Sequence, residues 1–368
     1  MFKAACAALA LSFLTILVAG CLEMQEDRSG NLQSVGLPGV PIWKAEKPVV
    51  TAQTQQLDSS AAANADWLST LNKWREMAGV RPVGENSNLS HGCELHAQYL
   101  VNQMPPGEND PGDLVMSMGA DMHHEANGRD GFTEEGAQAA VGGRHVQGVI
   151  QAADVSWSEA DGKADIDGLL VVPFHRLSLL APWAKVAGFG RAGTAPRSAA
   201  ALAIRGPEAD ASAAREISFP PANSTVPIGA MKYLEWPNPL SACPGYHIPV
   251  GLPVTLQLGK DQPVSLSDYS FSDETENRKL EACAFDSAGY SNPDPGQRAA
   301  AVKSLTSFGA VVLIPREPLQ TGHTYRVTLN VNGANDSWTF TVQAVQQTAS
   351  GTSGARLIDR SDFPIIAR

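Results

Sequence analysis

The spacing of the hydrophobic residues changes along this chain, and that change constrains its fold more than any other feature. From residue 66 to about residue 100 the apolar side chains recur at helical intervals. After residue 219 they alternate with polar ones, or stand in short runs separated by Gly, Pro, Asn and Asp, as is typical of antiparallel strands. The pattern therefore predicts an α+β protein in which a helix-rich part precedes a strand-rich part.

Helical spacing predicts three helices in the first part. One contains Trp67, Leu71, Trp74 and Ala78 and ends at the "AGVRP" stretch, where Gly and Pro stop it. A third helix is expected to start at Thr133, because acids follow it in the first turn. The second has an apolar stripe and an N-cap at Asn88 or Ser90; its stripe is Leu89, Cys93, His96, Ala97 and Leu100.

Two further stretches complete this part. The segment "DIDGLLVVPFHRLSLLAPWAKVAGFG" predicts a short helix, a turn at Pro173 and a loop, and "ALAIRG" predicts a strand. Residues 188–193 read "GFGRAG" and match the G-x-G-x-x-G pattern of dinucleotide sites. We interpret this as a chance match, because Pro196 falls where the phosphate-binding helix should begin and no βαβ pattern surrounds it.

The N-terminus predicts export. Lys3 precedes an apolar run from residue 4 to residue 18, which is too short to span a bilayer as a mature helix. The run ends in "LVAGC", which resembles the lipobox of bacterial lipoprotein precursors. That resemblance implies cleavage before Cys21, acylation of Cys21 and anchoring to a membrane by the acyl chains. The alternative is an ordinary signal peptide cut near Ala19.

Leu22 follows the cysteine in place of an aspartate. In the lipoproteins that this segment resembles, the absence of an aspartate after the cysteine directs sorting to the outer membrane. We therefore expect a location there, facing the periplasm or the cell surface. The formal net charge of −11 and the lack of a basic stripe argue against nucleic acid as a partner.

Three cysteines lie beyond Cys21, namely Cys93, Cys243 and Cys283. An exported chain can form disulfides, but an odd count leaves one thiol over. We favour a Cys243–Cys283 disulfide because both residues lie in the C-terminal half. Cys93 lies on a helix stripe and is interpreted as a buried thiol rather than a nucleophile.

Four segments in order give the chain a family resemblance. They are "LNKWREMAGVRPV", "LSHGCELHAQYLV", "HHE…GFTEEGAQAA" and "PFHRLSLLAPWAKVAGFG". In this order and spacing they resemble bacterial members of the CAP superfamily, whose domain is also called SCP. The resemblance covers residues 63–207. It implies an α/β/α sandwich with a central antiparallel sheet and a cleft that carries two histidines and two glutamates, sometimes with a divalent metal.

Carried over by position, the histidines match His124 (or His123) and His175. The glutamates transfer poorly, because Ala137 stands where many members have a carboxylate. Glu125 or Glu135 is the replacement on this side, and Glu159 is a weaker candidate for the other acid. His96, on the apolar stripe of its helix, is interpreted as a core or cleft-wall histidine.

A zinc ion held by His124 and His175 is therefore one hypothesis, and histidines hydrogen-bonded in a polar cleft without metal is the favoured one. No cofactor is required by any other motif. The chain lacks H-E-x-x-H, G-x-S-x-G, C-x-x-C and a phosphate-binding P-loop.

The C-terminal part resembles the all-β Ig-like sandwich appended to some CAP domains. Its clearest piece is "TYRVTLNVNGANDSWTFTV", which predicts a hairpin. His247 and His323 are interpreted as solvated loop residues. The predicted division of the chain is a signal peptide at 1–20, a lipidated cysteine and tether at 21–62, the CAP domain at 63–207, an extended connector at 208–245, the sandwich at 246–345 and a mobile tail at 346–368.

Two functions are compatible with this organisation. The favoured one is a non-enzymatic, membrane-anchored binding module for a lipid, a cell-wall glycan or a protein partner. The alternative is a hydrolase in which His124 and His175, with Glu125, act as acid and base or hold a metal that activates water.

Overall fold

A computed structural model describes eight stretches of the chain: residues 24–26, 32–34, 66–104, 118–140, 154–156, 162–194, 197–207 and 216–343. The chain divides into two units, Met1–Thr54 and Gln55–Arg368. In the first unit, β1 (Met24–Glu26) and β2 (Leu32–Ser34) form an antiparallel pair. The signal peptide, Cys21, Glu159 and the predicted tail lie outside the described residues, so these predictions stay predictions.

The helices of the N-terminal part of the second unit are α2 (Trp67–Met77), α3 (Ser87–Gln103), the 3₁₀ helix η1 (Gly119–His123), α5 (Glu134–Ala140), α6 (Gly162–Val171) and α7 (Pro173–Leu179). Four of them, α2, α3, α5 and α6, lie where the sequence predicts them, whereas η1 and α7 were not predicted. Two local predictions were wrong. The N-cap of α3 is Asn86, whose side chain accepts the Leu89 N–H, and Pro173 begins a helix because its fixed φ suits the first helical position.

A four-stranded sheet lies between these helices, in the order β3-β5-β6-β4. Its strands are β3 (Gly84–Glu85), β5 (Val186–Thr194), β6 (Arg197–Arg205) and β4 (Asp154–Ser156). The sheet is mixed rather than wholly antiparallel, because β3 runs parallel to β5.

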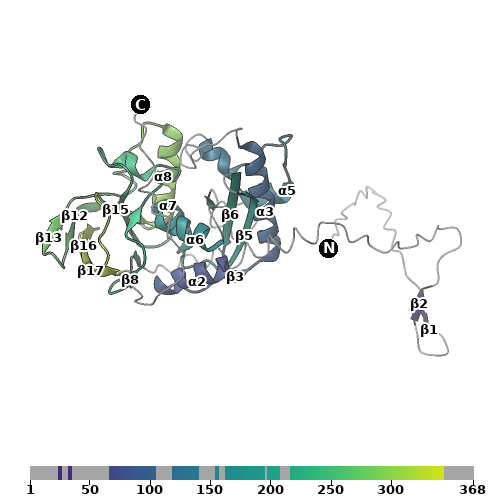
Figure 1. The fold of residues 1–368 in the computed structure, drawn as a ribbon, viewed down its shortest axis with the longest axis horizontal. Helices are drawn as coiled ribbons and strands as arrows, with labels where there is room; N and C mark the ends of the chain where they lie inside the picture. The colour runs from purple at the N-terminus through teal and green to yellow at the C-terminus, as the bar shows by residue number, and fades with distance from the viewer. Residues whose placement is uncertain are drawn as a thin grey trace, which may run out of the picture. The chain divides into compact units, whose positions relative to one another are not determined.

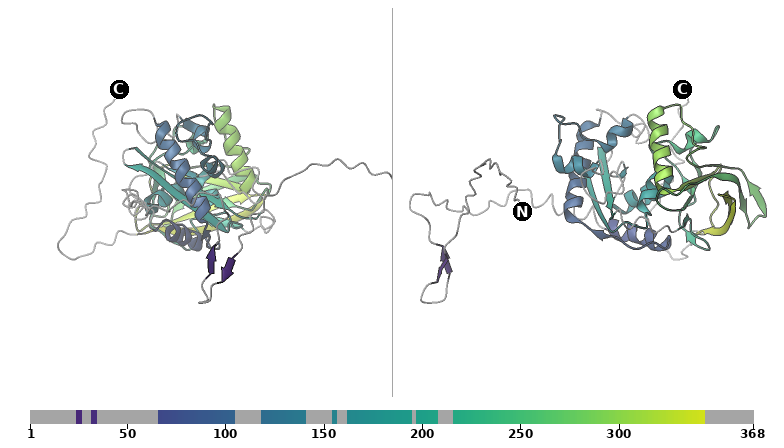
Figure 2. Two further views of the ribbon diagram at one scale, coloured as in Figure 1. Left: turned by 90° about the vertical axis from the view of Figure 1, so that its right-hand side faces the viewer. Right: turned by 180° about the vertical axis from the view of Figure 1, so that it is seen from behind.

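Helices cover both faces of this sheet, as Figures 1 and 2 show for α3 and α5 on one side and α6 and α7 on the other. Successive side chains of β6 point to opposite faces of the sheet, so each face has its own apolar core. Ala201 and Ala203 pack with Cys93 and Ala139 on the α3 and α5 side, whereas Leu202 and Ile204 belong to the core that contains α2, α6 and α7. The described helices and strands therefore form three layers.

The "GFGRAG" segment lies within β5 and forms no phosphate-binding loop. Its glycines permit close packing of α3. A Cβ on Gly188 would lie 2.4 Å from the Ser90 backbone nitrogen, and one on Gly190 would lie 2.1 Å from that of Glu94. The chance match predicted from the sequence thus has a packing explanation.

The C-terminal part contains two larger sheets. One has the order β14-β15-β11-β7 and the other β13-β12-β16-β17-β8. Their strands are β7 (Ile217–Phe219), β8 (Thr225–Val226), β11 (Val254–Gln257), β12 (Leu266–Asp273), β13 (Arg278–Leu280), β14 (Ala282–Phe285), β15 (Ala310–Pro315), β16 (Thr324–Val331) and β17 (Ala334–Val342). A small pair, β9 (Ala230–Met231) with β10 (Val250–Gly251), and a 3₁₀ helix η3 (Pro239–Ala242) lie in the segment between β8 and β11.

The predicted hairpin is confirmed. Val331 pairs with Ala334, so the turn consists of Asn332 and Gly333 alone. Both have positive φ, 54° and 81°, as a type I′ turn requires. The apolar residues of both strands, from Tyr325 to Val342, are buried at every second position.

This part is not all-β, because α8 (Pro295–Phe308) lies within it. The Asp294 side chain caps the helix by accepting the Gly296 and Gln297 N–H groups, and Gly309, with φ 55°, ends it. Only four of its residues are buried, namely Gln297, Ala301, Leu305 and Phe308. So sparse a stripe in an alanine-rich segment gives a weak periodic signal.

One continuous apolar core joins the layered part to the strand-rich part. The Trp183 and Phe308 rings stack with centroids 5.6 Å apart, and the buried Arg176 guanidinium lies 4.4 Å from the centroid of the Phe219 ring. The expected boundary at residue 246 does not separate two cores, since β7 and β8 of the expected connector already belong to the large sheets.

Candidate functional site

His175 lies at the start of α7, and its partner is a residue that the sequence did not single out. Its Nδ1 atom is 2.7 Å from Oε2 of Glu235. The same carboxylate accepts the backbone N–H groups of Phe174 at 2.7 Å and His175 at 2.9 Å. Glu235 therefore fixes both the imidazole ring and the first turn of α7.

The surroundings of Glu235 explain how a carboxylate is accommodated there. Glu235 and His175 are both buried, and Arg176 beside them is fully buried. Burial lowers the pKa of Arg176 to about 9, and the Glu235 carboxylate opposes that shift. Arg176 also donates to the carbonyl oxygens of Leu170, Val171 and Pro253. The positive and negative groups compensate each other in the interior.

His96 forms a second histidine–glutamate pair. Its Nδ1 is 3.0 Å from Oε1 of Glu125, and its Nε2 is 2.8 Å from the Met122 carbonyl oxygen. Both side chains are completely buried. Because both ring nitrogens have partners within the protein, this imidazole is placed to hold α3 against η1 rather than to bind a ligand.

Glu125 also explains a glycine in the "GAQ" segment. Its Oε2 accepts the Thr133 N–H at 3.0 Å, just before α5. A Cβ on Gly136 would lie 2.3 Å from Oε1 of Glu125, so only glycine leaves room for the carboxylate. Glu125 therefore contacts the first turn of α5 from outside the helix. Its carboxylate lies against Gly136, the residue before Ala137, where many CAP members carry a glutamate.

The remaining histidine and glutamate candidates are not members of these pairs. His124 and Glu135 are exposed, and His123 is half-buried with its ring centroid 6.5 Å from that of Trp236. Within the described ranges, the His, Cys, Asp and Glu side chains come together as a potential metal group at Asp273, Glu276 and His323 and not around His124 and His175. Since a zinc site wants at least three protein ligands, the described residues around His124 and His175 do not by themselves make up the metal site that the CAP resemblance allows.

A depression of about 330 Å³ lies on the segment that carries Glu235. Its apolar lining is Leu234, Leu240, Tyr246 and Ile248, and its polar lining is Asn238, Ser241 and His247. A polar network connects two of the lining residues, since the Ser241 hydroxyl donates to the Tyr290 hydroxyl, which donates to the Asn238 carbonyl oxygen.

Two further interactions involve the segment that lines the depression. Cys243 and Cys283 form a disulfide, the pair favoured from the sequence, which joins η3 to β14. The Arg316 guanidinium lies 5.1 Å from the centroid of the Tyr246 ring. Burial, helped by the charge of Glu281, raises the pKa of Tyr246 to about 12, so its hydroxyl remains neutral.

Cys93 is a buried thiol, and its Sγ lies 3.3 Å from the Gly188 carbonyl oxygen. This position on the inner face of α3 agrees with the interpretation of Cys93 as a core residue. His247 is exposed, as expected. His323 is not a solvated loop residue, because it is partly buried and its Nδ1 is 2.8 Å from Oδ2 of Asp273.

No protein-family model and no curated protein matches this chain. Across the described ranges, every helix falls short of the length and apolar content that a membrane-spanning segment needs.

Proposed function

We propose that this chain is an exported, lipid-anchored protein whose layered part is a CAP-like binding module without enzymatic activity. The observation that carries the proposal is that His96 and Glu125 are both used inside the fold. His96 has both ring nitrogens bonded, and the Glu125 carboxylate that faces it also accepts a backbone N–H. A general base needs a nitrogen directed at its substrate, which His96 does not offer.

The family part of the proposal rests on the order of the four sequence segments and on the layered arrangement. The segment "PFHR" forms the start of α7, and "HHE" ends η1 and supplies Glu125. An α/β/α arrangement with these segments on its helices is compatible with the CAP resemblance.

The ligand part of the proposal rests on the depression beside Glu235. An aromatic ring and three aliphatic side chains next to an amide, a hydroxyl and an imidazole suit a small ligand with an apolar face and hydrogen-bonding groups. A lipid or a cell-wall glycan has that character, and a protein partner is the third class.

Binding can be tested with the full chain in detergent, using a soluble cell-wall disaccharide and a short-chain phospholipid as probes in calorimetry. We expect one probe to bind, and Ile248→Asp to weaken it about 10-fold by placing a charge in the apolar lining. Tyr269→Ser is the matched control, because Tyr269 is similarly exposed, 37% against 39% for Ile248, and does not line the depression. Binding that survives Ile248→Asp would remove the depression as the site.

The anchor is tested separately. Replacing Cys21 with Ser should abolish incorporation of labelled fatty acid into the protein, because the acyl chains are attached at Cys21. Fatty-acid labelling of the Cys21→Ser chain equal to that of the wild type would contradict lipidation at this residue.

A hydrolase is the alternative, and the His175–Glu235 contact favours it. An imidazole held through Nδ1 by a buried carboxylate is oriented as in Ser-His-Asp enzymes. Hydrolysis of either probe by the wild-type chain, abolished in a folded His175→Ala variant, would replace the binding proposal with this one.

A further inference from the structure

The structure assigns a second site, at the far end of the strand-rich part: we propose that Asp273, Glu276 and His323 bind a divalent transition-metal ion, zinc being the best match. Among the described residues, these three offer one ligand atom each, and the three atoms lie within 4.8 Å of one another. This site is independent of the proposed binding function.

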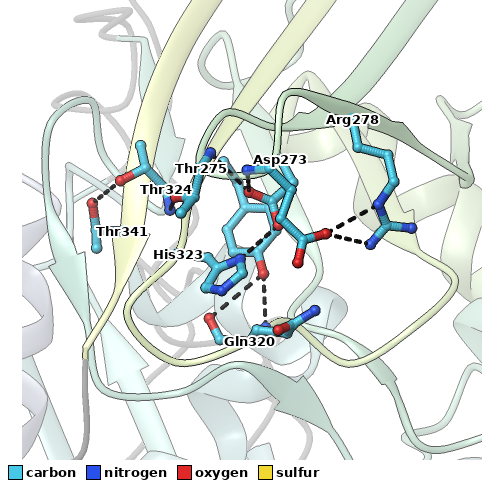
Figure 3. A network of polar contacts seen from close by, with 9 residues as sticks. Asp273, Thr275, Arg278, Gln320, His323, Thr324 and Thr341 are labelled. Atoms are coloured by element: carbon cyan, nitrogen blue, oxygen red, sulfur yellow. Dashed lines mark hydrogen bonds and ion pairs between the residues drawn. The ribbon is translucent and has the colours of Figure 1, made fainter.

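Two adjacent turns bring the three side chains together. Asp273 is the last residue of β12, and Glu276 lies in the turn that leads to β13. His323 lies immediately before β16, and Asp273 pairs with Tyr325 in the β12–β16 ladder. The β12–β16 register therefore fixes Asp273 beside His323 (Figure 3), and the turn between β12 and β13 carries Glu276.

The donor set selects the kind of ion. Two carboxylates and one imidazole suit zinc and similar first-row metals, whereas calcium and magnesium prefer a shell of oxygen atoms alone. Three protein ligands leave a coordination position for water.

Asp273 is prepared to act as an anionic ligand. Its side chain is 1% exposed, and its Oδ1 accepts the Thr275 N–H at 2.9 Å and the Glu276 N–H at 3.1 Å. These two bonds and the 2.8 Å contact between its Oδ2 and His323 Nδ1 fix the orientation of the carboxylate.

His323 is braced on its other side by Tyr325. The two rings stack with centroids 6.4 Å apart, and the Tyr325 hydroxyl accepts the Gln320 N–H at 2.7 Å. Figure 3 shows the His323 ring directed at Asp273. A ligand held on two sides loses little freedom when an ion binds.

Glu276 is the ligand that is accessible to an ion from solvent. Its side chain is 41% exposed, so an ion can reach the group from solvent. Its present partner is Arg278, with 3.1 Å between Nη2 and Oε2, and Figure 3 shows Arg278 directed toward the same turn. Exposed ion pairs of this kind contribute little, so Glu276 can exchange Arg278 for a metal.

The test uses the full chain in detergent after removal of metal with a chelator. Zinc chloride is titrated in calorimetry, with magnesium chloride as the comparison ion. We expect one zinc ion to bind at this site, and binding to weaken at least about 10-fold in Glu276→Gln and in His323→Gln.

Glu274→Gln is the matched control. Glu274 neighbours the site and forms the same kind of exposed pair, with 3.1 Å between its Oε2 and Arg326, but it is not one of the three ligands. Its zinc affinity should equal that of the wild type. Absence of zinc binding by the wild type overturns the proposal. So does unchanged binding in both ligand variants, which would place zinc elsewhere, for example on exposed histidines.

Discussion

The His175–Glu235 and His323–Asp273 pairs use the same local chemistry in different surroundings. Their nitrogen–oxygen distances are 2.7 Å and 2.8 Å, and each carboxylate also accepts two backbone N–H groups. The His175 side chain is 8% exposed and lies within the continuous core, whereas the His323 side chain is 19% exposed and has an accessible carboxylate beside it.

A histidine–carboxylate contact therefore does not by itself indicate a ligand site. At His175 the pair joins two segments that are 60 residues apart in the chain. At His323 the pair is part of a three-residue group with an open side. Solvent access to the pair and the presence of a third potential ligand, Glu276, distinguish the proposed binding site at His323 from the structural pair at His175.

The largest expected difference concerns Glu235→Ala. It leaves the His175 ring and two backbone N–H groups without their acceptor in the interior, and it also removes the negative charge near the buried Arg176. We expect the free energy of unfolding to fall by about 3–5 kcal/mol, measured by denaturant titration. Glu235→Gln, which keeps the shape and one acceptor oxygen, should lose less. A loss below about 1 kcal/mol for Glu235→Ala would show that the pair is not structural.

Asp273→Asn should have a smaller effect. The amide oxygen still accepts the backbone N–H groups of the turn, and only the charge-assisted bond to His323 is lost. We expect a decrease of about 1.5–3 kcal/mol in the free energy of unfolding at neutral pH. Equal losses for Asp273→Asn and Glu235→Ala would remove the distinction between the two pairs.

The sequence predicted the elements of these two regions better than it predicted their contacts. Trp67 and Leu71 identify α2, and Asn332–Gly333 identifies the hairpin, because local periodicity and turn chemistry determine both. Glu235 could not be found in this way. It lies in a proline-rich segment without periodicity, and its role depends on a partner 60 residues away.

Two other differences have the same origin. Glu125 is a candidate from the sequence because it adjoins two histidines, but its partner is His96, which lies 29 residues earlier in the chain. On the sequence alone His323 is interpreted as a solvated loop residue, and only the β12–β16 register places it next to Asp273. Tertiary pairing, not local pattern, determines which acid faces which histidine.

The acid sensitivity of the two regions provides a third test. The pKa of Asp273 is lowered from 3.8 in the folded state, so its contribution to stability is fully present above pH 3.8 and is lost as the pH falls through the lower folded value. The difference in unfolding free energy between the wild type and Asp273→Asn should therefore be constant from pH 7 to about pH 4 and shrink below that. Denaturant titrations at several pH values measure it. A difference that is the same at pH 7 and pH 3 would contradict a carboxylate held in its ionised form by His323.

The smallest expected effect concerns Arg278, which competes with metal for Glu276. Replacing Arg278 with Gln removes an exposed ion pair worth about 0.2–1 kcal/mol, so the stability of the protein should change little. Because this ion pair no longer has to be broken before Glu276 can bind the ion, zinc should bind about 1.5–5 times more tightly, since 1.4 kcal/mol corresponds to a factor of ten.

Arg326→Gln is the control, because Arg326 pairs with Glu274 outside the group and its loss should alter zinc affinity less than the loss of Arg278. Equal gains in both variants would mean that positive charge around the turns acts only at long range. A gain specific to Arg278 would show that Glu276 itself reaches the ion, which is the feature that distinguishes His323 from His175.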